Sequence, residues 1–445
     1  MTLRYRDILQ KAWPVVLANA SVPLLGLSDT AVIGNLGTLS DLGAIAFGSV
    51  IFSFVYWGFG FLRMGTTGFV AQAVGARDET EVRAAFMRAL IMAVLIGVLL
   101  ILIQSAISSV SLSLLQGSDA VETITRDYIA TRIWGAPAAL VLFAISGCLI
   151  GLGMNKTLLM VQLVLNGLNI LLDIVFAGVW GMGAHGIALG TAVAEWTTVL
   201  FGLWLLYRAL SQRLKASAAT NEVLFIPVAR LRDKTRWRQT LTANGDIMIR
   251  TLLLVASFAW FVRQSAQFGD DVLAANHILL QLISFSAFFL DAFAYVAEAL
   301  VGEAAGAKDV AAFDAAVRKT TELSGVCALG LAAVIVFAGN SLVPLISQHE
   351  SVIAAAATSL PFAAMYVALA FAAFQLDGIF IGTTRTREMR NASVVSALVF
   401  FMLSLVLMLQ WQLAGLWLAF IGFVILRAIC LVWYFPALRR SIALS

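Results

Sequence analysis

Four polar residues recur at helical spacing within one apolar stretch of the chain. They are separated by four, three and four positions: Gln162, Asn166, Asn169 and Asp173. On an α-helix this spacing gathers them into one stripe about 60° wide. Amide and carboxylate groups on an apolar helix must face protein or water, because lipid offers them no partner. The stripe predicts either hydrogen bonds between helices or the polar wall of a water-filled cavity.

A carboxylate also stands in the first apolar stretch. Asp29 follows Pro14 by fifteen residues and Pro23 by six. Proline removes a backbone hydrogen bond and kinks its helix, so we expect Pro14 and Pro23 to act as a hinge. A carboxyl group held away from water favours its neutral form. This makes Asp29 a candidate for binding and releasing a proton as the helix bends.

Other ionisable residues lie in apolar stretches, where each costs about 2.5–3.5 kcal/mol to insert. Asp246 and Arg250 are four residues apart, so they are expected to pair on one helix face. Glu195 comes four residues after Thr191, and the two share a face of their helix. Glu195 is therefore a further candidate for the polar site.

The composition indicates a lipid environment. The chain has 445 residues, of which 61% are hydrophobic and 12% charged, whereas soluble domains are about half apolar and a quarter charged. Apolar stretches long enough for a bilayer predict an all-α integral membrane protein with twelve transmembrane helices. They lie near residues 11–35, 42–74, 86–115, 128–151, 157–180, 185–208, 240–267, 273–304, 320–347, 354–383, 391–412 and 414–436.

Basic residues are distributed unevenly between these helices. If the N-terminus is cytoplasmic, 23 of the 29 lysines and arginines fall in cytoplasmic segments, and the outer segments keep only Arg126, Arg132 and Arg263. Such a bias sets orientation. We therefore expect a multi-pass protein of the cell (inner) membrane, with both termini cytoplasmic and the lipid bilayer as its partner. The net charge of +4 reflects this bias, and we expect no nucleic-acid partner.

The two halves of the chain repeat. At an offset of 231 residues, GARD at 75–78 matches GAKD at 306–309, and two glycine pairs also match: Gly147 with Gly378, and Gly151 with Gly382. The repeat predicts two parallel six-helix lobes, 1–208 and 240–445, joined by a cytoplasmic linker, 209–239. Because channels more often assemble identical subunits around a pore, an internal repeat favours a transporter.

The polar residues of the first half have no copy in the second. The offset of 231 places Trp260, Phe400 and Ser404 at the positions that correspond to Asp29, Asn169 and Asp173. The polar site is therefore expected in the first lobe alone.

The sequence lacks signatures of catalysis. It has no spacing of nucleophile and base, and its three histidines and three cysteines are scattered. The GxGxxG at 181–186 follows no predicted strand, which argues against a dinucleotide site, and no Walker A pattern supplies an ATP motor. We expect no enzyme activity, no metal site and no cofactor.

Four segments together resemble the MATE (multidrug and toxic compound extrusion) family, in its DinF-like branch. They are DTAVIGNLG at 29–37, NGLNILLDIVFAG at 166–178, LVGEAAGAKD at 300–309 and LDGIFIGTTRTREMRN at 376–391. The resemblance implies two six-helix bundles that form a V around a central cavity. It also implies antiport of a cation against drug-like molecules, which are often cationic and amphipathic.

The resemblance further implies roles for individual residues. The positions that match the family's coupling site are Asp29, Asn169, Asp173 and Thr191, while Gln162 and Asn166 complete the polar stripe towards the substrate cavity. Asp377 matches a carboxylate that NorM-like relatives carry in the tenth helix. The seventh helix offers only Asp246 near its inner end, which argues against a sodium site in the second lobe.

The coupling ion and the transported compound each have an alternative. We expect H⁺ rather than Na⁺ as the coupling ion, although converging oxygens in the first lobe also suit Na⁺. The alternative function is a lipid-linked saccharide flippase of the same superfamily, which would line its cavity with Arg and Lys for pyrophosphate. Few basic residues stand in mid-membrane positions, which favours the exporter. We expect a monomer.

Overall fold

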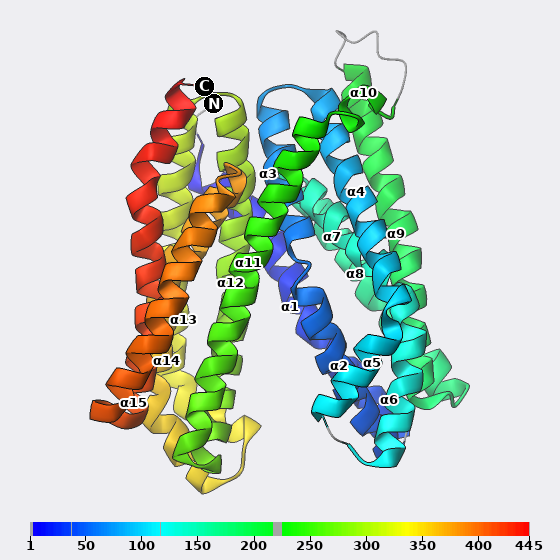
Figure 1. Cartoon of the computed structure of the whole chain (residues 1–445), viewed down its shortest axis with the longest axis vertical. Coiled ribbons are helices and arrows are strands. Elements are labelled where there is room, and N and C mark those ends of the chain that lie inside the picture. The colour runs from blue at the N-terminus through cyan, green and yellow to red at the C-terminus, as the bar shows by residue number, and fades with distance from the viewer. Residues whose placement is uncertain (1–2, 37, 116, 217–224, 445) are drawn as a thin grey trace. The chain divides into compact units, whose positions relative to one another are not determined.

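The computed structural model describes residues 3–36, 38–115, 117–216 and 225–444, apart from the side chains of residues 22–25, 27, 28, 30, 35, 36 and 444. Throughout these ranges the secondary structure is helical, and they contain no strand (Figure 1). The predicted all-α class is confirmed.

The helices of the first half follow one another with short connections. They are α1 (Tyr5–Leu36), α2 (Leu39–Trp57), α3 (Phe61–Gly75), α4 (Glu79–Leu102), α5 (Gln104–Leu115), α6 (Asp119–Arg132), η1 (Ile133–Gly135), α7 (Ala136–Gly151), α8 (Asn155–Asp173), η2 (Ile174–Val179) and α9 (Gly183–Ala216). A short α10 (Val228–Leu231) leads into the second half. It contains α11 (Lys234–Ser265), η3 (Ala266–Phe268), α12 (Asp270–Gly306), α13 (Val310–Ile346), α14 (Glu350–Gly382) and α15 (Thr386–Leu444).

Among the described residues, ten helical segments are long and apolar enough to cross a membrane. One of them, α15, covers two predicted helices, which meet at Gln412, where the backbone leaves the helical region (φ 49°, ψ −127°). Helix α1 covers a further predicted helix. The described part of the chain thus accounts for the twelve predicted helices, several of them built from two consecutive pieces, such as α4 and α5.

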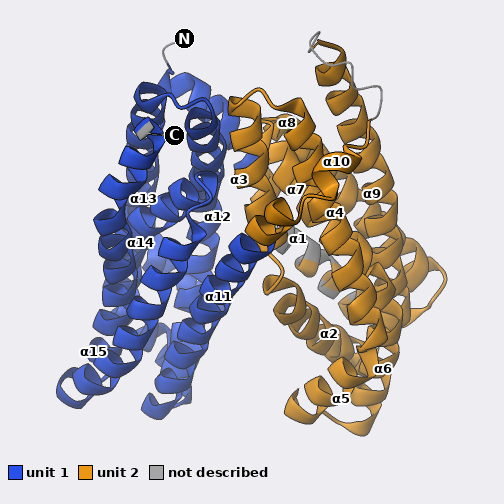
Figure 2. Cartoon of the chain, turned by 45° about the horizontal axis from the view of Figure 1, so that its top comes forward, with its two compact units in different colours: residues 1–16, 241–445 blue, residues 17–240 orange. Residues whose placement is uncertain are grey.

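The chain divides into two compact units (Figure 2). One consists of Met1–Val16 with Leu241–Ser445, and the other of Leu17–Thr240. Helix α1 therefore contributes its first residues to one unit and the rest to the other. Within the predicted linker 209–239, α9 continues to Ala216 and α10 precedes α11, while residues 217–224 lie outside the described ranges. The predicted lobe boundaries stay a prediction.

The internal repeat is visible in matching backbone details of the two units. Residues 231 positions apart share a positive φ at two places, in the pairs Arg77 (55°) with Lys308 (57°) and Gly153 (69°) with Thr384 (53°). Asp78 caps the start of α4 and Asp309 caps the start of α13, each by accepting a hydrogen bond from a backbone N–H. The two units therefore leave and re-enter helices in the same way.

The glycine pairs of the repeat permit equivalent close contacts between helices. A Cβ at Gly147 of α7 would overlap the carbonyl oxygen of Arg63 in α3, and one at Gly378 of α14 would lie 2.6 Å from that of Ala294 in α12. Arg63 and Ala294 are themselves 231 residues apart. Close approach of backbones is the usual role of small residues spaced four apart in membrane helices.

Candidate functional site

The predicted polar stripe lies on α8 and faces protein. Asn169 and Asp173 are fully buried, Asn166 is 8% exposed, and Gln162 is half-buried. Directly after Asp173 the helix widens into a π-helical turn, Ile174–Val179, a local distortion that is frequent at functional sites. The prediction that the stripe avoids lipid is correct for its three buried members.

The carboxyl groups of Asp29 on α1 and Asp173 on α8 lie within hydrogen-bonding reach of each other. Asp29 is 8% exposed and Asp173 is fully buried. Two ionised carboxylates at this separation repel each other strongly, and one shared proton converts the repulsion into a hydrogen bond. The two aspartates thus form a pair that favours holding a proton.

Several acceptor oxygens at this place receive no hydrogen bond from the described N–H and O–H groups. They are Oδ1 of Asp29, Oδ1 of Asn169 and both carboxylate oxygens of Asp173. A buried acceptor without a donor costs about 1–3 kcal/mol, and more when it is charged. Protons or a cation supply what these oxygens lack, so the cluster is suited to bind either.

Asn169 and Thr191 connect α8 with α9. Asn169 Nδ2 donates to Thr191 Oγ1 at 2.9 Å, and the same hydroxyl donates to the backbone carbonyl of Ile187 at 2.8 Å. The Thr191 proton is therefore engaged, and the hydroxyl serves Asn169 as an acceptor. This arrangement fixes the amide plane of Asn169 next to the aspartate one turn later on the same helix.

Two glycines of α9 allow it to approach the end of α8. A Cβ at Gly190 would lie 2.6 Å from Asp173 Oδ1, and a Cβ at Gly186 would lie 2.8 Å from the backbone nitrogen of Ala177. Neither position has room for a larger residue. Because Gly190 has no side chain, the Asp173 carboxylate can occupy this position next to α9.

The stripe also touches α1. Asn166 Nδ2 donates to the backbone carbonyl of Ser21 at 3.3 Å. Pro14 and Pro23 both lie inside α1, and Pro14 is buried, while the side chain of Pro23 lies outside the described residues. The predicted hinge positions therefore belong to the helix that carries Asp29.

Glu195 of α9 is bound by an arginine from another helix. Arg132 at the end of α6 forms a bidentate ion pair with Glu195, in which Nη1 donates to Oε2 at 2.8 Å and Nη2 donates to Oε1 at 2.5 Å. Arg132, which the distribution of basic residues assigns to an outer segment, is 7% exposed. Sequence spacing finds neighbours on one helix, whereas this pair joins two helices. The sequence does indicate that a glutamate inside a membrane helix needs a cationic partner, and this requirement could have predicted a pair between Glu195 and a nearby arginine.

Asp377 belongs to the other compact unit, so the structure does not group it with Asp29 and Asp173. Its Oδ2 accepts hydrogen bonds from Arg250 Nη2 and from Arg427 Nη2, the latter at 2.9 Å.

The predicted pairing of Asp246 with Arg250 is wrong, because Asp246 binds Arg390 of α15 at 2.6 Å instead. Asp246 and Arg250 thus each bind a residue of a neighbouring helix and not each other.

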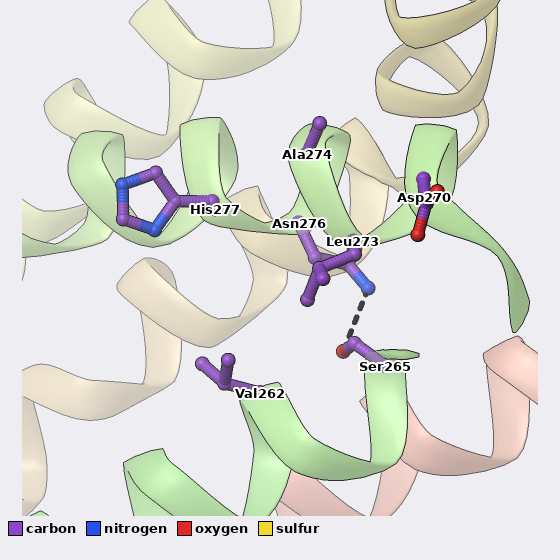
Figure 3. Close-up of a pocket in the computed structure, with 7 residues that line it drawn as sticks. All are labelled: Val262, Ser265, Asp270, Leu273, Ala274, Asn276 and His277. Atoms are coloured by element: carbon purple, nitrogen blue, oxygen red, sulfur yellow. Dashed lines mark hydrogen bonds between the residues drawn. The ribbon is translucent and has the colours of Figure 1, made fainter. Parts of the chain in front are cut away.

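An open cavity of about 490 Å³ lies in the unit that contains Asp377 (Figure 3). Figure 3 shows Asn276 at its centre, with Nδ2 donating to Ser265 Oγ at 2.9 Å. The other lining residues are Val262, Asp270, Leu273, Ala274 and His277. None of the predicted site residues lines it.

Comparison with known proteins places these features in a family. The MatE family model matches residues 14–175 and 247–407. The chain is 35% identical to DNA damage-inducible protein F of Escherichia coli, over 95% of this chain and 90% of that protein. It is 26% identical to the probable multidrug resistance protein NorM of Pasteurella multocida, over 81% and 77%.

Solved structures share the fold. A MATE crystal structure in the bent conformation superposes with a TM-score of 0.85 at 18% identity, covering 98% of this chain and 96% of that one. The bent form of the Vibrio cholerae MATE transporter VcmN gives 0.84 at 19% identity, covering 99% and 98%. A MATE in the straight conformation gives 0.83 at 19% identity, covering 99% and 96%.

Proposed function

Because the chain belongs to the MatE family, we propose that it is a secondary active exporter that exchanges protons for amphipathic, often cationic organic compounds. The family consists of transporters, so the chain is a multi-pass membrane transporter and not an enzyme. The coupling ion and the substrate class are the parts that we add.

The observation that carries the proposal is the buried pair of Asp29 and Asp173, whose oxygens lack donors among the described groups. A proton bound here neutralises a buried charge and turns two repelling carboxylates into a hydrogen-bonded pair. A cationic substrate and a proton compete for the same negative charge. Competition of this kind couples the binding of one to the release of the other.

The proposed cycle uses the hinge in α1. External protons neutralise Asp29 in the outward-open state, and α1 re-bends near Pro14 or Pro23, which removes the polar contacts that hold the substrate. The boundary between the two compact units falls between Val16 and Leu17, within the same part of the helix. Solved MATE relatives carry the descriptions bent and straight, which supports two forms of the fold.

The available driving forces are sufficient for this exchange. A pH difference of one unit supplies about 1.4 kcal/mol per proton. A membrane potential of 100 mV adds about 2.3 kcal/mol for each net charge moved. We further propose cytoplasmic termini, a location in the cell (inner) membrane, a monomer, and no cofactor besides the coupling ion.

Sodium is the competing coupling ion. A hard cation such as Na⁺ requires several oxygens, and Asp29, Asn169 and Asp173 offer them. The Thr191 hydroxyl is already engaged, because its oxygen accepts a hydrogen bond from Asn169 and its proton is donated to the carbonyl of Ile187. The saccharide flippase is less well supported than the exporter. Three of the six described buried arginines, Arg132, Arg250 and Arg427, are bound to carboxylates, so these three are poorly placed to hold a pyrophosphate.

The experiment uses purified protein in vesicles and the cationic dye ethidium. We expect an imposed pH gradient at constant Na⁺ to drive ethidium transport, and a Na⁺ gradient at constant pH to drive none. Transport under the sodium gradient alone would contradict proton coupling. Transport under neither gradient would argue against an exporter of cationic compounds. A flippase would instead translocate a labelled lipid-linked saccharide in the same vesicles.

A further inference from the structure

The ion pair of Arg132 and Glu195 is buried in the same unit as the aspartate pair and takes no part in the proposed cycle. The side chains of both residues are 8% exposed. The Arg132 guanidinium lies 5.2 Å from the ring centroid of Phe52 and 5.7 Å from that of Tyr56. The rings of Phe52 and Tyr56 and the bidentate contact with the Glu195 carboxylate hold the guanidinium in one position.

Arg132 is held next to the segment of α9 that adjoins the aspartate pair. Glu195, which binds Arg132, follows Thr191, the partner of Asn169, by one helical turn, and a Cβ at Gly190 of the same helix would lie 2.6 Å from Asp173 Oδ1. A positive charge favours the ionised form of nearby carboxylates, whereas burial opposes it. Glu195 neutralises part of the charge of Arg132. The balance between the arginine and the glutamate therefore acts directly on the pair that binds the proton.

The titratable groups around Arg132 come from α6 itself and from two of the helices packed against it, α2 and α9. Helix α2 contributes Tyr56, α9 contributes Glu195 and His185, α6 itself contributes Tyr128, and α5 has no charged residue. His185 is exposed and hydrogen-bonded to Thr131 Oγ1 at 2.9 Å. Arg126 and Asp127 of α6 and Asp41 of α2 are not buried. Tyr56 and Tyr128 are neutral at physiological pH, which leaves Glu195 as the buried counter-charge.

The fold itself does not require this ion pair. At the offset of 231 residues, Ala363 and Leu426 stand in the other unit where Arg132 and Glu195 stand here. That unit forms the equivalent helices without a charge at either place. The close fit is nevertheless specific in this unit. A Cβ at Gly135 would overlap the Glu195 carboxylate and would lie 2.7 Å from Arg132 Nη1.

We propose that Arg132 is a positioning residue that sets the pH range in which Asp29 and Asp173 exchange their proton, and that Glu195 limits its effect. The transport part of this inference rests on the proposed function. The part that concerns proton affinity does not, because it can be measured without transport.

The two charges predict opposite effects when they are removed. Glu195→Gln leaves the charge of Arg132 uncompensated, which favours ionised aspartates and moves proton binding to lower pH by about one unit. Arg132→Gln alone would strand a buried glutamate and endanger folding. The double variant Arg132→Gln with Glu195→Gln removes the pair as a unit. It is expected to move proton binding to higher pH, because the positive charge that favours the ionised aspartates is lost.

The test is an infrared titration of the protonated carboxyl band in purified protein, assigned by its loss in Asp29→Asn and in Asp173→Asn. Arg132→Lys keeps the positive charge and is the matched control, with a midpoint close to wild type. Thermal unfolding verifies that each variant is folded, and if Glu195→Gln does not fold, the double variant decides. Shifts of opposite sign in Glu195→Gln and the double variant support the proposal. Unchanged midpoints, or shifts in one direction for both, would overturn it.

Ethidium transport as a function of pH provides the second readout. We expect its midpoint to move in the same directions as the infrared titration. If wild-type protein shows the carboxyl titration but no proton-driven transport, the proposed function fails, and the role of Arg132 is still decided by the infrared shifts.

Discussion

The indole Nε1 of Trp260 donates a hydrogen bond to Ser404 Oγ at 2.9 Å. These residues stand 231 positions after Asp29 and Asp173, the two aspartates that meet in the other unit. The repeat thus brings the same two positions together twice, once as a neutral hydrogen bond and once as a pair of carboxyl groups. The fold accepts the neutral version, so folding alone does not explain the carboxyl version.

Asp173→Asn tests this contrast. The substitution removes a buried charge from the membrane interior, so we expect the protein to remain inserted and folded while proton-driven export is lost. The measurement is ethidium transport per folded molecule in vesicles. Ser404→Ala is the control at the corresponding position. It loses a hydrogen bond worth about 0.5–1.5 kcal/mol, and its transport should stay near the wild-type rate. Wild-type transport by Asp173→Asn would make the polar stripe purely structural.

Gly190→Ala addresses the position of the same carboxylate. The added methyl group would lie 2.6 Å from Asp173 Oδ1, and such overpacking costs about 1–3 kcal/mol. We expect a lower unfolding temperature and at least a tenfold drop in transport. Gly167→Ala is the matched control, since a Cβ there meets nothing within 4 Å and a helical alanine is favoured over glycine. Equal behaviour of the two variants would argue against this constraint.

Thr191→Val removes the acceptor that Asn169 uses. The buried amide would lose its partner at a cost of about 1–3 kcal/mol, and the orientation of Asn169 beside Asp173 would be lost. We expect a strong loss of ethidium transport per folded molecule and only a small decrease in the unfolding temperature. In Thr197→Val an exposed hydroxyl that donates only to the carbonyl of Val193 is lost, and no change is expected. An unaffected Thr191→Val would show that the amide orientation is irrelevant.

Asp377→Asn should fail in a different way. It leaves the guanidinium groups of Arg250 and Arg427 buried without their carboxylate, and breaking such a pair costs about 3–5 kcal/mol. We expect poor recovery of folded protein by size-exclusion chromatography and a strongly lowered unfolding temperature. Asp314→Asn breaks an exposed pair with Arg439, worth about 0–1 kcal/mol, and should fold normally. A stable but inactive Asp377→Asn would instead assign Asp377 to transport.

Much of the architecture was accessible from sequence because the membrane simplifies the problem. Long apolar stretches predict the helices, and the stripe on 162–173 predicts its own burial, since lipid cannot satisfy amides and carboxylates. The repeat was readable from GARD and GAKD, whose positive-φ residues Arg77 and Lys308 the structure places in equivalent turns.

Contacts between helices were the part that the sequence could not provide. Helical periodicity identifies which residues share a face, but it contains no information on the neighbouring helix. This is why Asp246 and Arg250 were paired with each other although each binds another helix. It is also why the partner of Glu195, 63 residues away, was missed. Local distortions such as the break between α4 and α5 and the π-helical turn after Asp173 arise from the same tertiary packing.

In the proposed cycle a proton and the substrate compete for Asp29 and Asp173. Proton release on ethidium binding, measured in weakly buffered detergent solution, tests it most directly, because linkage requires that binding of one ligand expels the other. We predict that wild-type protein releases about one proton per bound ethidium, and that the variant with both Asp29→Asn and Asp173→Asn releases none. Binding by wild-type protein without proton release, or equal release by the variant, would contradict the account.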